Sequence, residues 1–153
     1  MAQPFTRLKR EAIFAATRED EQPMLQFWLN SGLRPGELQV LQWDHIDFGK
    51  KIAYIVLNQV AGIAKAPKTE AGKREVELNT EAVDALKQQR AISQVRGPRV
   101  WLNSRTLKPW TTDAQIRKTL WLPVMERAGI EYRNPYQIRH TYASTLLTDL
   151  PSL

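Results

Sequence analysis

The 153-residue sequence contains no cysteine and only two histidines, His45 and His140. The absence of cysteine excludes disulfides and cysteine-built metal sites, and two histidines so far apart do not form a zinc motif. The sequence also has no apolar run long enough to cross a membrane and no signal-peptide pattern. We therefore expect a single domain of the reducing cytosol, with no metal site and no membrane anchor.

Acidic residues are scarce in the later part of the chain, which gives the protein a net charge of +6. Up to Gly49 there are five Lys/Arg and seven Asp/Glu, whereas from Lys50 onward there are seventeen and nine. A basic surface of this kind suits a polyanion, because each neutralised phosphate releases counterions. Basic solvated faces are common, however, so the charge alone does not identify nucleic acid as the partner.

The hydrophobic pattern predicts a mainly helical α+β fold with a small antiparallel sheet. Apolar residues at helical spacing and capping residues predict helices over 6–16, 23–32, from 35, 79–89, 111–129 with a kink at Pro123, and from 135. β-Branched or alternating runs predict strands over 52–57, 74–78 and 100–102. Residues 62–73 are expected to form a lysine-bearing hairpin tip between the first two strands.

Arg34 is predicted to lie in a tight joint between two helices. Gly32 is a typical helix end, and Pro35 restricts Arg34 to an extended or turn conformation before starting the next helix. An arginine held so rigidly suits the binding of an anion. The structural alternative is a salt bridge from Arg34 to Glu37.

A second arginine is expected near the start of the helix that follows Asn134 and Pro135. Asn134 is a suitable N-cap, and Arg139 and His140 follow within the first turns, where the helix dipole favours an anion. An ordinary amphipathic helix with surface polar residues is the alternative. Two such arginines can bind one phosphate through bidentate hydrogen bonds and stabilise its transition state, and a lysine can protonate the leaving oxygen.

These stretches resemble the two arginine boxes of the tyrosine recombinases, the phage integrase family. Residues 33–38 (Leu-Arg-Pro-Gly-Glu-Leu), followed by residues 43–47 (Trp-Asp-His-Ile-Asp), resemble the first box. Residues 136–141 (Tyr-Gln-Ile-Arg-His-Thr) resemble the second, usually written His-x-Leu-Arg-His-Thr, and residues 67–74 resemble the lysine hairpin between them. The resemblance covers nearly the whole chain in the expected order.

The resemblance implies a helical catalytic domain with a sheet of about three strands at one edge, acting on double-stranded DNA without a cofactor. It implies that Arg34 and Arg139 clamp the scissile phosphate, supported by Glu37 and His140, and that Lys68 is the general acid. Lys65 and Lys73 are less favoured candidates for that acid, and His140 fits an orienting or packing role better than direct catalysis. Contacts to DNA are expected from Lys65, Lys73, Arg74, Arg117 and Lys118.

Two departures from the family pattern affect this interpretation. Tyr136 stands where the second box normally has a catalytic histidine. It is still a candidate catalytic residue, because a phenol can hydrogen-bond a phosphate oxygen or position a neighbour, but it is a poor base near neutral pH. None of the four tyrosines fits the position of the nucleophile, and the family's later Gly-His motif is missing. We therefore expect residues 1–153 to be one catalytic domain that lacks the nucleophile segment and the N-terminal DNA-clamping domain.

Three functions remain open from the sequence. The first is site-specific recombination through a 3′-phosphotyrosyl link in a full-length protein that forms a homotetramer on DNA in a bacterial cell, at the nucleoid. In that case the present chain binds DNA without cleaving it, and is monomeric or associates through non-native contacts. The second is a non-catalytic DNA-binding relic or regulator, and the third is an enzyme like the type IB topoisomerases, which share this chemistry.

Overall fold

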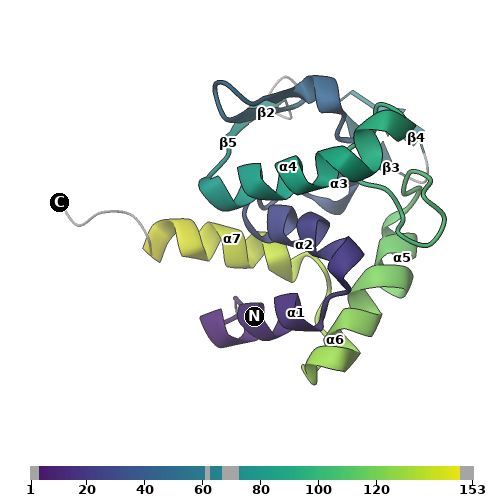
Figure 1. Cartoon of the computed structure of the whole chain (residues 1–153). Helices are drawn as coiled ribbons and strands as arrows, with labels where there is room; N and C mark the ends of the chain where they lie inside the picture. Colours follow the sequence, from purple (N-terminus) through teal and green to yellow (C-terminus); the bar gives the residue numbers. More distant parts are fainter. Residues whose placement is uncertain (1–3, 61–62, 67–72, 149–153) are drawn as a thin grey trace.

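The computed structural model describes residues 4–60, 63–66 and 73–148, and in this part of the chain helices predominate (Figure 1). The α-helices are α1 (Arg7–Ala16), α2 (Gln22–Leu29), α3 (Pro35–Val40), α4 (Thr80–Ser93), α5 (Asp113–Ile116), α6 (Leu122–Ala128) and α7 (Gln137–Thr148). Short 3₁₀ turns cover Glu19–Glu21, Trp43–His45 and Gln94–Arg96. The mainly helical α+β prediction is confirmed.

The helix starts follow from local capping chemistry. The side chains of Thr6, Asn79 and Thr112 each accept a hydrogen bond from a backbone N–H in the first turn of α1, α4 and α5. The Asn134 side chain accepts the backbone N–H of Tyr136 before α7. Because these bonds join residues only two or three positions apart, the sequence alone was enough to predict them.

The main sheet is antiparallel and has three strands in the order β1 (Ile46–Asp47), β2 (Ile52–Ile55) and β5 (Arg74–Glu77). Its register places Ala53 opposite Val76 and Ile55 opposite Arg74. A separate two-stranded ribbon, β3 (Asn58–Val60) and β4 (Ile63–Lys65), lies between β2 and β5 in the chain. The strand β5 is therefore an edge of the main sheet, and it begins with Arg74.

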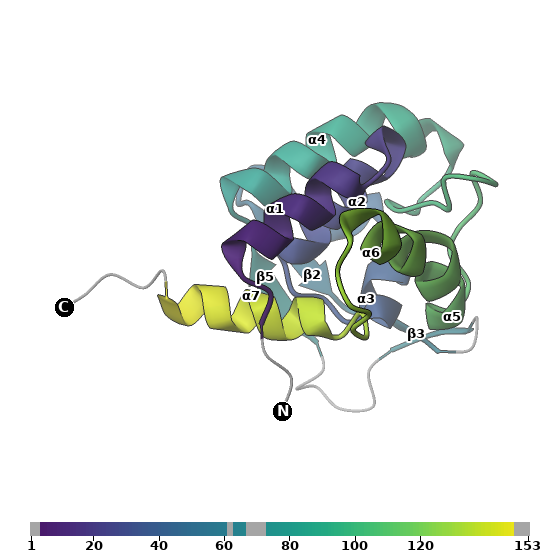
Figure 2. The same ribbon diagram turned by 90° about the horizontal axis from the view of Figure 1, so that it is seen from below.

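Helix α2 lies at the centre of the molecule. It packs against α4 on one side and against α7 and α1 on the other, and α1 also packs against α6 (Figures 1 and 2). Its Leu25, Phe27 and Trp28 are almost completely buried. Helix α2 is therefore the central core helix, and it ends next to the joint that carries Arg34.

Two predictions about the elements were wrong in detail, and one feature of the helix around Pro123 was not predicted. The third strand of the sheet is Ile46–Asp47 and not residues 100–102. In that run Leu102 makes an isolated bridge with Pro109, and the Val100 N–H donates to the carbonyl of Leu41. The predicted hairpin loop from residue 62 contains strand β4 in its first part. Before Pro123 the helix widens into a π-helical turn over Arg117–Trp121, which gives the proline ring room that a regular helix would not.

The N-terminal segment is joined to α7 by a buried hydrogen bond. The backbone N–H of Phe5 donates to Oγ1 of Thr141 at 2.9 Å, and the Thr141 hydroxyl donates to the carbonyl of Gln137 at 2.8 Å. The Phe5 ring packs against Trp121, with ring centroids 6.0 Å apart. The start of the chain thus supports the helix that carries Arg139. Within the described residues, no helix has the length and apolar character needed to cross a membrane.

Candidate anion-binding site

Arg34 is the N-cap residue of α3 and has an extended backbone, with φ −67° and ψ 150°. This is the conformation that the following proline imposes. The Arg34 backbone N–H donates to Oε1 of Glu37 at 2.9 Å, so the Glu37 side chain caps the helix. The guanidinium group of Arg34 is 3.9 Å from Oε2 of Glu37, and the side chain is 48% exposed.

Glu37 is buried and forms its strong ion pair with Arg74 of strand β5. Nη1 of Arg74 donates to Oε2 of Glu37 at 2.6 Å, and Nη2 donates to Oε1 at 2.9 Å. Burial alone would raise the pKa of the Glu37 carboxyl, but the bonds from Arg74 and from the Arg34 backbone outweigh it and hold that pKa below its ordinary value. Glu37 is therefore a buried carboxylate that stays ionised.

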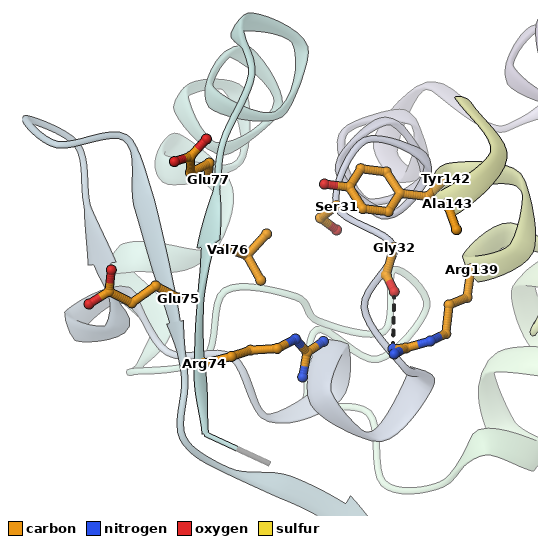
Figure 3. A pocket seen from close by; sticks show the side chains of 9 residues that line it. All are labelled: Ser31, Gly32, Arg74, Glu75, Val76, Glu77, Arg139, Tyr142 and Ala143. Atoms are coloured by element: carbon orange, nitrogen blue, oxygen red, sulfur yellow. Dashed lines mark hydrogen bonds between the residues drawn. The ribbon is translucent and has the colours of Figure 1, made fainter. Parts of the chain in front are cut away.

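Arg139 reaches the same region from the first turns of α7. Its Nη1 donates to the carbonyl of Gly32 at 3.4 Å, and Gly32 lies beyond the end of α2, two residues before Arg34 (Figure 3). Burial lowers the pKa of the Arg139 guanidinium, and the nearby positive charges of Arg34 and Arg74 lower it further. Arg139 therefore lies within electrostatic range of both Arg34 and Arg74.

A cavity of about 290 Å³ lies between strand β5, the end of α2 and helix α7. Figure 3 shows Arg74 reaching into it from β5 and Arg139 from α7, with the ring of Tyr142 forming part of its wall. The Ser31 hydroxyl also lies in the wall, buried and without a hydrogen-bond partner in the described part of the chain. Burial raises the pKa of the Tyr142 phenol, so this tyrosine is neutral at physiological pH.

The site combines the guanidinium groups of Arg34, Arg74 and Arg139 with the buried carboxylate of Glu37, and the carboxylates of Glu75 and Glu77 also line the cavity. Such an arrangement can hold a phosphate or another oxyanion, because guanidinium groups stay charged and offer paired donors. The described residues contain no group of three or more His, Asp or Glu side chains that could hold a metal ion. The side chains of this site can therefore stabilise an anion.

The other predicted site residues lie around the cluster or elsewhere on the surface. Tyr136 is 46% exposed in the turn before α7, close enough to Arg139 to influence its pKa, and His140 is exposed on α7. Lys68 lies outside the described residues. The side chains expected to contact DNA are exposed at the end of β4, before β5 and on the π-helical turn, namely Lys65, Lys73, Arg117 and Lys118. Arg74 instead directs its guanidinium to Glu37.

Sequence reasoning missed the pairing of Arg74 with Glu37 and the contact of Tyr142 with Gly32. Glu37 has an arginine three positions away at Arg34, so nothing in the sequence favoured a partner 37 residues later. Gly32 was recognised only as a helix end. Its carbonyl holds Arg139, and its lack of a side chain admits the Tyr142 ring, which the sequence pattern does not reveal.

Comparisons with known proteins find matches to one family. The model of the phage integrase family matches residues 6–150. The prophage integrase IntR of Escherichia coli K12 is 31% identical over 95% of this chain and 41% of its own length. IntQ of the same strain, whose name describes it as defective, is 31% identical over 77% of this chain and 36% of its length.

Among solved structures, the Tn1549 transposon integrase in complex with a circular intermediate DNA has a similar fold. The TM-score is 0.83 at 17% identity, over 97% of this chain and 54% of that one. The match covers the helices and the small sheet described above. The chain spans about two-fifths of the length of the curated relatives it matches.

Proposed function

The chain belongs to the phage integrase family, and on this basis we propose that it forms the phosphate-binding part of a tyrosine recombinase that acts on double-stranded DNA. The observation that carries the proposal is the convergence of Arg34 and Arg139. Arg34 caps the start of α3, and Arg139, in the first turn of α7, donates to the carbonyl of Gly32, two residues before Arg34 in the chain. The basic charge of the later part of the chain supports the same partner.

In the proposed reaction a tyrosine hydroxyl attacks the scissile phosphorus and displaces the 5′ oxygen of the DNA. Arg34 and Arg139 bind the non-bridging oxygens and stabilise the additional negative charge of the transition state. Lys68 gives a proton to the departing 5′ oxygen. The 3′-phosphotyrosyl link keeps the energy of the broken bond, and the 5′ hydroxyl of a second strand later attacks it, so the cycle needs no nucleotide cofactor.

We propose that the 153-residue chain binds DNA but does not cleave it. It has four tyrosines, and Tyr142, the one in the wall of the cavity, packs against Gly32 with its phenol neutral. Tyr142 is also on the same helix as Arg139, only three residues later, so it cannot move independently of the clamp. The nucleophile would come from a segment that follows in a longer protein.

A nicked duplex that traps covalent adducts tests both parts of this proposal. We expect the 153-residue chain to shift the duplex in a gel at low salt and to give no denaturant-resistant adduct. Absence of binding to any duplex at low salt would overturn the DNA-binding role. A covalent adduct would overturn the claim that these residues lack the nucleophile, and mapping it by mass spectrometry would identify the tyrosine.

The proposal extends to assembly and cellular location. We propose that the full-length protein forms a homotetramer on DNA at the bacterial nucleoid, whereas residues 1–153 alone are monomeric or associate through non-native contacts. Sedimentation of the 153-residue chain with and without duplex DNA measures its state directly. A tetramer formed by this chain alone would contradict the proposal that tetramer formation needs the further segments of a longer protein.

A non-catalytic DNA-binding relic or regulator is the second candidate. Two observations favour it, namely Tyr136 in place of the usual histidine and the similarity to IntQ, whose name marks it as defective. Restoring the histidine with Tyr136→His in the longest available gene product separates the two. If the protein is a recombinase in which Tyr136 is functional, the wild-type protein recombines DNA without the substitution. If it is a relic, the Tyr136→His variant does not recombine DNA either.

A further inference from the structure

The Glu37 carboxylate lies where two arginines could compete for it. Arg34 is three positions earlier on the same helix turn, and Arg74 begins the edge strand β5 on the other side. In the structure Arg74 makes two short bonds to both carboxylate oxygens, and Oε1 also accepts the Arg34 backbone N–H. The Arg34 guanidinium is left at 3.9 Å, beyond hydrogen-bonding distance.

We infer that Arg74 is a positioning residue of the clamp, because it holds the Glu37 carboxylate away from the Arg34 guanidinium and so leaves Arg34 free to bind phosphate. This inference rests on the proposed function, in which Arg34 is a phosphate ligand. It assigns Arg74 a role different from that of a DNA contact, since its guanidinium is turned toward Glu37. The role also differs from that of a general structural ion pair, since its effect is exerted on one named side chain.

The competition follows from the burial of Glu37. The side chain of Glu37 is only 4% exposed, so an ionised carboxylate there must keep a charged partner. If Arg74 is removed, the nearest cation is the Arg34 guanidinium, and a shift of about 1 Å closes the gap to hydrogen-bonding distance. Arg34 would then be bound to a carboxylate and would have fewer donors left for a phosphate.

The same pairing connects the lysine hairpin to the clamp. Arg74 is the first residue of β5, and the segment predicted to carry the general acid Lys68 immediately precedes it in the chain. The two bonds from Arg74 to Glu37 fix the start of this strand against the first turn of α3. Arg74 thus joins the start of β5 to the helix that Arg34 caps.

A pair of variants separates positioning from the loss of a positive charge. Arg74→Gln lowers the net charge by one, whereas Glu37→Gln combined with Arg74→Gln restores the wild-type net charge and removes the carboxylate that would capture Arg34. We expect Arg74→Gln to weaken binding of a 25-base-pair duplex about tenfold, and the double variant to regain most of that loss. Arg96→Gln, an exposed arginine away from the cluster, is the charge control and should weaken binding less than threefold.

The state of Arg34 itself is measured without DNA. In ¹H–¹⁵N spectra of the side-chain Nε–Hε groups, the Arg34 signal should become protected from exchange in Arg74→Gln and return to wild-type behaviour in the double variant. Arg74→Lys, which keeps the charge but not the paired donors, should give an intermediate result. An Arg34 signal that is unchanged in folded Arg74→Gln would overturn the inference, and so would equal binding losses in Arg74→Gln and the double variant.

The two readouts keep the inference separate from the proposed function. If the wild-type chain binds no duplex, the DNA-binding proposal fails, and the exchange of the Arg34 Nε–Hε still decides whether Arg74 controls Arg34. If Arg74→Gln does not fold, Arg74→Lys and the double variant provide the same comparison. If the Arg34 Nε–Hε group exchanges at the wild-type rate in both of these variants, the inference is contradicted.

Discussion

The ring of Tyr142 lies directly against Gly32, and the contact leaves no room for a side chain at position 32. A β-carbon on Gly32 would overlap Cδ1 of Tyr142 and lie 2.7 Å from its Cγ. Gly32 also has φ 64°, a left-handed conformation that other residues adopt only with strain. Since the Gly32 carbonyl accepts the Arg139 guanidinium, this glycine connects the end of α2 to both arginines of the site.

Gly32→Ala is therefore expected to destabilise the protein by about 2–4 kcal/mol, the sum of left-handed strain and overpacking. Urea unfolding followed by tryptophan fluorescence measures the change. Gly129→Ala is the matched control, because Gly129 has φ 67° but no atom within 4 Å of its added β-carbon, so it should lose only about 1 kcal/mol. Equal losses in the two variants would mean that the Tyr142 contact contributes nothing.

The two arginines beside Glu37 should differ in their effect on stability. Arg34→Ala removes a half-exposed side chain at 3.9 Å from the carboxylate, so the free energy of unfolding should change by less than about 1 kcal/mol. Arg74→Ala leaves the buried Glu37 without its paired donors and should cost about 2–3 kcal/mol. Thermal unfolding of both variants decides the matter. A larger loss of stability in Arg34→Ala than in Arg74→Ala would mean that the main role of Arg34 is a salt bridge to Glu37.

A feature of this site could be predicted from the sequence when the residues that form it are close together in the chain. The arginines were found because each is held by its immediate neighbours, Arg34 by Pro35 and Arg139 by the cap at Asn134. The pairing of Arg74 with Glu37 could not be found in this way, because it joins strand β5 to helix α3 across 37 positions of the chain. The meeting of these distant segments depends on the tertiary fold. The family resemblance indicated that Arg34 and Arg139 belong to one site, but it did not indicate the pairing of Arg74 with Glu37.

In the fold, too, elements that depend on neighbouring residues were predicted, and an element that depends on distant pairing was missed. Helices with a capping side chain two or three residues from its partner were predicted with nearly correct bounds. Strand β1 was missed because it has only two residues, Ile46 and Asp47, and its formation depends on pairing with β2. The apolar run 100–102 looked like a strand, but Val100 and Trp101 are buried in the core without joining the sheet.

Two buried glutamates should give opposite pH dependences of stability. The pKa of Glu37 lies below 4.5 in the folded protein, so its stabilising effect is present above pH 4.5 and is lost as the pH falls through the folded pKa. Burial raises the pKa of Glu21 above 4.5, although the Ser104 hydroxyl opposes this shift, so its contribution is present below pH 4.5 and is lost as the pH rises.

Melting temperatures between pH 3 and 7 test this prediction in two variants. Glu37→Gln should reduce the loss of stability below pH 4.5, although it lowers stability at neutral pH. Glu21→Gln should reduce the loss that accompanies a rise above pH 4.5 and should be at least as stable as the wild type near pH 7. If both variants changed the same limb of the profile, the assigned directions of the two pKa shifts would be wrong.

The last prediction concerns Arg117 and Lys118, which are exposed on the π-helical turn between α5 and α6. If both contact phosphates, Arg117→Gln with Lys118→Gln should reduce the slope of log affinity against log salt by about 1–2, because each lost contact releases about 0.9 fewer counterions. The control combines Lys87→Gln with Arg96→Gln, two exposed residues whose loss changes the net charge equally. Anisotropy titrations of a labelled duplex at several salt concentrations give both slopes. Equal reductions would show that binding depends on overall charge, whereas a reduction confined to the first pair would place the π-helical turn on the DNA.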